Sequence, residues 1–74
     1  MKPIDAVKEA ASRTGTPITA IGPAIGKTKT YVSSIAGKES RPRCDTLVSM
    51  LGACGYKLCA IPRDSVPESA IVIE

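Results

Sequence analysis

The sequence predicts a mainly α-helical fold of four short helices that ends in a β-hairpin. Apolar residues recur at intervals of three and four positions up to residue 54, which is the spacing of one helix face. After Gly55 the pattern changes to two continuous apolar runs, which are typical of short strands. Because the chain has only 74 residues, we expect one structural domain, with a helical bundle over 1–55 and a hairpin over 56–74.

The first helix is expected over 3–14, where a proline occupies the first helical position and a glycine follows the last turn. The second helix is expected from Pro17 to Gly26. Pro23 lies inside it and has no amide to bond to the preceding turn, which costs a regular helix about 3 kcal/mol. We therefore expect the second helix to be kinked or frayed.

The third and fourth helices are expected over about 29–36 and 44–54. Thr28 suits the N-cap of the third helix because its hydroxyl can accept a hydrogen bond from an amide of the first turn. Between the two helices, the stretch 38–43 is polar and contains a proline, which predicts a loop. The sequence thus places two short helices around a tight turn at 26–28, with one further helix on each side.

The two apolar runs of the predicted hairpin cover residues 58–61 and 70–73, and turn-forming residues lie between them. A strand with one solvent face alternates apolar and polar residues, whereas these runs are apolar on both faces. We expect the bundle to cover one face and a second subunit to cover the other, so that the hairpin forms a homodimer. The alternative is a hairpin that folds only onto its own helices.

The composition argues against several classes of function. The chain has no histidine, the residue that most often serves acid–base and nucleophilic catalysis, so we do not expect an enzyme. Cys44, Cys54 and Cys59 have neither the spacing of a zinc site nor that of a disulfide framework, which predicts no metal or cofactor and a reducing, cytoplasmic location. The longest apolar run is far shorter than the roughly 18 residues of a membrane span.

Positive charge gathers in one stretch of the sequence. Residues 27–43 contain five cationic side chains and one carboxylate, Glu39, although the whole chain has a net charge of only +3. A basic segment on a nearly neutral body is typical of proteins that bind polyanions. The alternative interpretation is a solvated positive face without a ligand.

Residues 16–51 resemble the lambdoid phage repressor and Cro family of helix-turn-helix regulators. The resemblance rests on the order and spacing of a turn glycine, a cap residue, a recognition helix, a basic loop and a following helix. The matching residues are Gly26, Thr28, Tyr31, Val32, Ser33, Ile35, Arg41, Pro42, Arg43, Leu47 and Leu51. The chain departs from the family at Gly22, where the family usually has an alanine packed against the recognition helix, and at Pro23.

The resemblance implies a sequence-specific, double-stranded DNA-binding transcriptional regulator of prokaryotic or phage type. It would act as a dimer with the recognition helix, about 29–36, in the major groove. The expected base contacts are Lys29, Thr30, Ser33 and Ser34. The expected phosphate contacts are Lys27, Thr28, Tyr31, Lys38, Arg41 and Arg43. For Tyr31 the alternative is packing against the loop before the fourth helix. For the whole protein it is a protein-interaction module, such as an antitoxin-like subunit, with the same fold.

Overall fold

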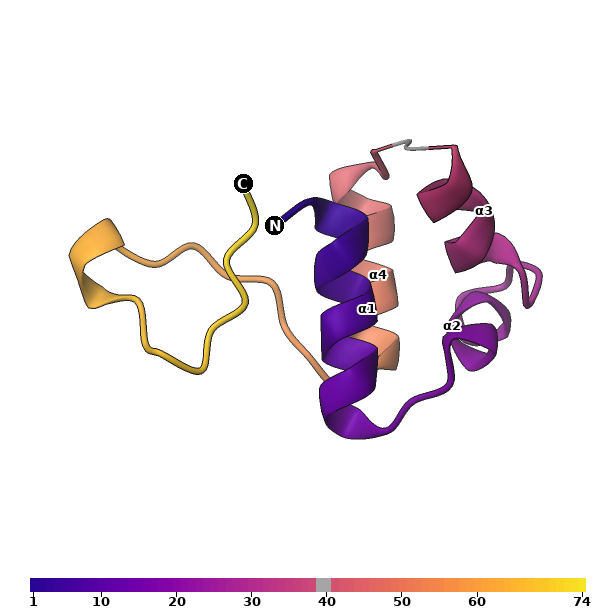
Figure 1. Ribbon diagram of the computed structural model, residues 1–74, viewed down its shortest axis with the longest axis horizontal. Helices are drawn as coiled ribbons and strands as arrows, with labels where there is room; N and C mark the ends of the chain where they lie inside the picture. Colours follow the sequence, from indigo (N-terminus) through magenta and orange to yellow (C-terminus); the bar gives the residue numbers. More distant parts are fainter. Residues whose placement is uncertain (39–40) are drawn as a thin grey trace.

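The computed structural model describes residues 1–38 and 41–74, and this part of the chain contains four α-helices and one short 3-10 helix. Their bounds are Pro3–Thr14 (α1), Ile18–Ala24 (α2), Tyr31–Gly37 (α3), Cys44–Ala53 (α4) and Arg63–Ser65 (η1). In Figure 1, α1 and α4 lie against each other, α2 and α3 pack together on one side of them, and the chain after α4 extends to the other side. We call residues 1–55 the bundle and residues 56–74 the C-terminal segment.

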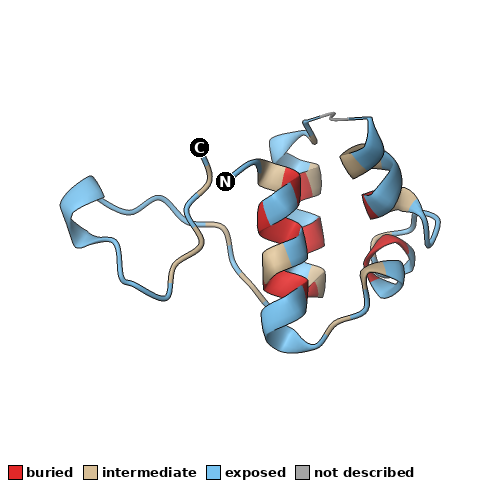
Figure 2. Cartoon of the chain, viewed as in Figure 1, coloured by how far each residue is buried: buried red, intermediate tan, exposed pale blue. Residues whose placement is uncertain are grey.

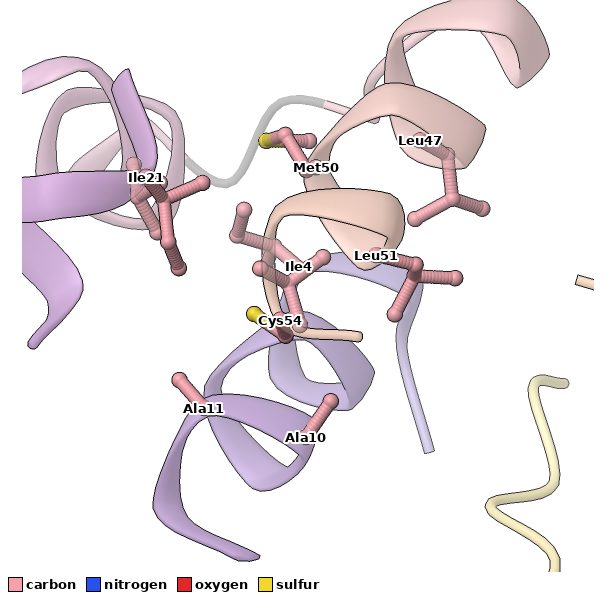
Figure 3. Close-up of a cluster of buried hydrophobic side chains, with 10 residues drawn as sticks. Ile4, Ala10, Ala11, Ile21, Leu47, Met50, Leu51 and Cys54 are labelled. Atoms are coloured by element: carbon pink, nitrogen blue, oxygen red, sulfur yellow. The ribbon is translucent and has the colours of Figure 1, made fainter. Parts of the chain in front are cut away.

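Each α-helix contributes one large side chain that is fully buried. These side chains are Val7, Ile21, Val32 and Met50. Smaller or less completely buried apolar residues of α1 and the α4 region complete the cluster, and Figure 3 shows Ile4, Ile21 and Met50 converging between three helices. Burying a side chain of this size stabilises the fold by roughly 1.5–3 kcal/mol. The four helices are therefore held together by one shared core.

Two helices follow the sequence prediction closely, and a third is present but shorter. α1 has the predicted bounds, and α4 ends at Ala53, one residue earlier than predicted. α2 ends at Ala24, directly after Pro23, and is shorter than predicted. The proline supplies no amide for the helical hydrogen bonds, and the chain leaves the helix within two residues of it.

The start of α3 corrects the prediction. The sequence predicts a helix from residue 29 that is capped by Thr28, but α3 begins at Tyr31, and no side chain caps it. The Thr28 carbonyl accepts a hydrogen bond from the Tyr31 amide (3.1 Å), which closes a non-helical turn. The hydroxyls of Thr28 and Thr30 lie 3.3 Å apart and form a hydrogen bond with each other, and the Thr28 hydroxyl does not cap the helix. The connection between α2 and α3 is consequently 25–30 rather than a three-residue turn.

The predicted hairpin is wrong. All residues of the C-terminal segment are described, and none of them lies in a β-strand. The chain reverses direction around η1, and residues from 58–61 and 70–73 line one open groove, but no backbone hydrogen bond joins the two runs. A lone pair of strands is marginal in water. Here Leu58 and Ile71 pack their side chains against the bundle core instead.

The C-terminal segment is tied to the bundle at two places. The guanidinium of Arg13, in the last turn of α1, donates to the Ser69 carbonyl oxygen (2.6 Å) and to the Glu9 carboxylate (3.0 Å). The hydrogen bond to Glu9 raises the pKa of Arg13 above its ordinary value. At the chain ends, the Glu74 amide donates to the Met1 carbonyl (2.9 Å). These contacts hold the segment beside α1.

Candidate nucleic-acid interface

The connection between α2 and α3 begins with a tight helix ending. Gly26 has a φ of +79°, in the left-handed region that glycine adopts without strain. Its amide donates to the Pro23 carbonyl (3.2 Å), and the Lys27 amide donates to the Gly22 carbonyl (2.8 Å). These two bonds form the Schellman pattern, which satisfies the last carbonyls of a helix and turns the chain away from its axis. Residues 27–30 then run along the surface and are all exposed.

Gly22 allows α2 and this connection to approach each other closely. It is buried, and a Cβ at this position would overlap the Thr28 carbonyl oxygen and lie 3.2 Å from the Cβ of Tyr31. The obstacle is backbone rather than the end of a flexible side chain, so an alanine here would have to displace the connection. Gly22 therefore sets the position of Thr28 and, through it, the start of α3.

Tyr31, the first residue of α3, is half-buried and packs against the bundle core. The Lys27 ammonium lies 5.7 Å from the centre of its ring, within the range of a cation–π interaction. Tyr31 therefore has a packing role in the bundle and helps to place Lys27 at the beginning of α3. Its contact with a DNA phosphate stays a prediction.

Small polar side chains line the outward face of α3. Thr30, Ser33 and Ser34 are exposed and follow the three- and four-residue spacing of one helix face, whereas Val32 is fully buried on the other side. Lys29 lies in the connection just before this face and is exposed as well. The four predicted base contacts thus lie together around the first half of α3. No bulky side chain among them prevents a close approach to another surface.

Cationic side chains flank this face at both ends of α3, and all of them are exposed. The residues are Lys27 and Lys29 before the helix, and Lys38, Arg41 and Arg43 after it. Because α3 has seven residues, the helix that lies between the two groups is about 10 Å long at 1.5 Å per residue. The charge segment predicted from the sequence is therefore divided between the two ends of one short helix.

Most of these cations have no acidic partner in the described part of the chain. No described carboxylate lies within 4.0 Å of Lys27, Lys29, Lys38 or Arg41. Arg43 lies 3.5 Å from Asp45, but the two side chains are 85% and 71% exposed, so the pair is weak and open to competition by another anion. Glu39, the single carboxylate that the sequence places among these cations, lies outside the described residues.

One determinant of this interface was not predicted from the sequence. The predicted contact residues do surround α3, but the contact that positions the helix comes from Gly22, which carries no functional group. The signal was present in the sequence, because Gly22 is a glycine inside a predicted helix at a place where the resembled family has alanine.

Residues 1–38 and 41–74 give less support to a metal site or a membrane-spanning helix. No three metal-ligating side chains come together there, and no helix there is long and apolar enough to cross a membrane. Cys54 is buried, which raises the pKa of its thiol, while Cys44 and Cys59 are exposed.

Comparisons with models of protein families, with curated proteins and with solved structures find no match to this chain. Any assignment of function therefore depends on the geometry around α3.

Proposed function

We propose that the protein is a sequence-specific regulator that binds double-stranded DNA by placing α3 in the major groove. The observation that supports the proposal best is the exposed, small polar face of α3 with cations at both of its ends. The major groove is about 12 Å wide and admits an α-helix. A helix lying in it has phosphates on both sides, where the flanking cations would meet them.

In this arrangement the flanking cations fix the register of the protein and the α3 face reads the bases. Lys27, Lys38 and Arg41 would bind phosphates, which supplies affinity without sequence preference. Lys29 can donate to O6 and N7 of guanine, and the hydroxyls of Ser33 and Ser34 can pair with several bases. The chain has no asparagine or glutamine, so the usual bidentate contact with adenine is missing and guanine-containing sites are expected to bind best.

The proposed role also implies a cellular location. A prokaryotic or phage regulator that binds operator DNA acts in the cytoplasm. The three cysteines are free thiols in the structure, which accords with a reducing compartment. The proposed action is binding rather than catalysis.

Fluorescence anisotropy with a labelled duplex at several salt concentrations tests the proposal. We expect the affinity to fall steeply with salt, and Arg41→Ala to lower the slope of log K against log salt concentration by about one unit, because one phosphate contact is lost. Arg63→Ala is the matched control, since Arg63 is an exposed arginine in η1, on the opposite side of the molecule from α3 (Figure 1). Absence of binding at low salt, or an equal change in both variants, would contradict the proposal.

A further inference from the structure

A cavity of about 240 Å³ lies between the C-terminal segment and the bundle, and we call it the segment cavity. It shares several lining residues with the open groove between the two apolar runs, but only the segment cavity reaches the bundle. Ala6 of α1 and Leu51 of α4 line it on the bundle side, and residues of the C-terminal segment form the rest of its wall. The two apolar runs therefore enclose a space together with the helices.

The lining of the segment cavity is chiefly aliphatic. Apart from Tyr56, Lys57 and Cys59, every lining residue is an alanine, leucine, isoleucine or proline. Sites for small molecules usually have this composition, in which many apolar side chains surround a few polar groups. An apolar cavity of about 150 Å³ holds a benzene molecule, so the segment cavity has room for a phenyl ring with a short alkyl chain.

The wall formed by residues 70–73 is tied to the bundle at both of its ends. Before it, the Arg13 guanidinium donates to the Ser69 carbonyl oxygen (2.6 Å). After it, the Glu74 amide donates to the Met1 carbonyl oxygen (2.9 Å). The segment cavity is therefore present without a ligand, as is usual for small-molecule sites.

The charge around the segment cavity favours an anionic ligand. Lys57 lines the cavity, is exposed, and has no described carboxylate within 4.0 Å of its ammonium group. No described carboxylate lines the cavity itself. A bound carboxylate would thus meet a cation that is free to pair with it, whereas a bound organic cation would meet no anion.

We propose that the segment cavity binds a small organic acid, with a hydrocarbon group inside the cavity and a carboxylate at Lys57. No residue after Cys54 is buried (Figure 2), so such a ligand would remove from water apolar surface that the bundle leaves uncovered. In Figure 1 the C-terminal segment and α3 lie on opposite sides of α1 and α4, so a ligand in the cavity would leave the outward face of α3 free. This proposal does not depend on DNA binding.

An NMR titration of the full chain with 4-phenylbutanoate tests the proposal. We expect saturable shift changes at the amides of residues 56–61 and 70–73, with a dissociation constant of about 1 mM or lower. The uncharged alcohol 4-phenyl-1-butanol has the same hydrocarbon group and separates the two parts of the site. Lys57→Gln should weaken the carboxylate about two- to fivefold, as expected for one exposed ion pair, and leave the affinity for the alcohol unchanged.

Two phenylalanine substitutions test where the hydrocarbon group binds. Ala70→Phe should raise the dissociation constant at least about tenfold, because the added ring takes up the space that the ligand needs. Val72→Phe is the matched control, since Val72 belongs to the same run but lines only the open groove, and it should leave the constant unchanged. Far-ultraviolet circular dichroism of both variants reports whether the helices have remained folded.

Thiol alkylation gives a second measurement that requires no substitution. Cys44 and Cys59 are both exposed, but only Cys59 lines the segment cavity. Saturating 4-phenylbutanoate should slow the reaction of Cys59 with iodoacetamide and leave the rate at Cys44 unchanged.

Several results would overturn the proposal. Absence of saturable binding in the millimolar range would do so, as would equal weakening by Ala70→Phe and Val72→Phe or equal protection of the two thiols. An equal effect of Lys57→Gln on the acid and the alcohol would reject a carboxylate at this site. Protection of Cys59 that rises with protein concentration alone would show that a second copy of the chain, rather than a small molecule, covers the cavity.

Discussion

Similar apolar residues are buried in the bundle but remain exposed or only partly buried in the C-terminal segment. Both are rich in isoleucine, valine and leucine, but all the buried residues lie between Ile4 and Cys54, and the segment contributes only partly buried side chains (Figure 2). In the bundle, four helices share one core, and helical bonds together with bonds in the turns between the helices pair many of the backbone amides. The segment has neither advantage, because its two extended runs make no backbone hydrogen bond to each other and lie only partly against the bundle core.

Under the proposed function the bundle presents α3 to DNA, and its shared core would hold that helix in place. The C-terminal segment contributes contacts with α1 but no buried residue.

Gly22→Ala tests whether close packing inside the bundle fixes α3. The added methyl would overlap the Thr28 carbonyl oxygen, so we expect the free energy of unfolding to fall by about 3 kcal/mol. Gly52→Ala is the matched control, because Gly52 lies in α4 with nothing within 4 Å of an added Cβ, and it should stabilise the protein by about 1 kcal/mol. Urea unfolding measures both changes. A neutral Gly22→Ala would show that the connection is not held by this contact.

A pair of valine substitutions compares the two regions directly. Val32 is fully buried in α3, so Val32→Ala should cost about 2–3 kcal/mol through lost burial and the cavity that remains. Val72 is 50% exposed in the C-terminal segment, and Val72→Ala should cost less than about 0.5 kcal/mol. Equal losses in thermal unfolding would mean that the segment shares the core of the bundle.

Much of the helical fold could be predicted from the sequence because its signals are local. The helix over 3–14 follows from one apolar face with a proline at its start and a glycine after its end, and α1 has these bounds. The start of α3 could not be predicted in the same way. It depends on the contact between Gly22 and Thr28, which lie on different elements and meet only after the chain has folded.

The hairpin prediction failed for a different physical reason. The apolar runs at 58–61 and 70–73 indicate that the chain needs cover there, but such runs do not specify which surface supplies it. Part of that cover comes from the bundle core, and the two runs form no backbone hydrogen bonds with each other. The tie between Arg13 and the Ser69 carbonyl, which helps to hold the segment, joins residues 56 positions apart and leaves no pattern in the sequence.

The candidate site was easier to predict than the arrangement that holds it. Its cations lie within one stretch of the sequence, residues 27–43, and a polar helix face between them follows from the three- and four-residue spacing. Their division into residues before and after the helix follows from the predicted helix over 29–36, and the structure changes only the place of Lys29, which lies before α3 rather than inside it.

An NMR titration of the backbone amides with a short duplex tests most directly whether the α3 side of the bundle binds DNA. We expect the largest shift changes at residues 27–34, 38 and 41–43, since these carry the proposed base and phosphate contacts, and only small changes at 58–73. The changes should weaken as the salt concentration rises. Shift changes concentrated in the C-terminal segment, or none at low salt, would contradict this account.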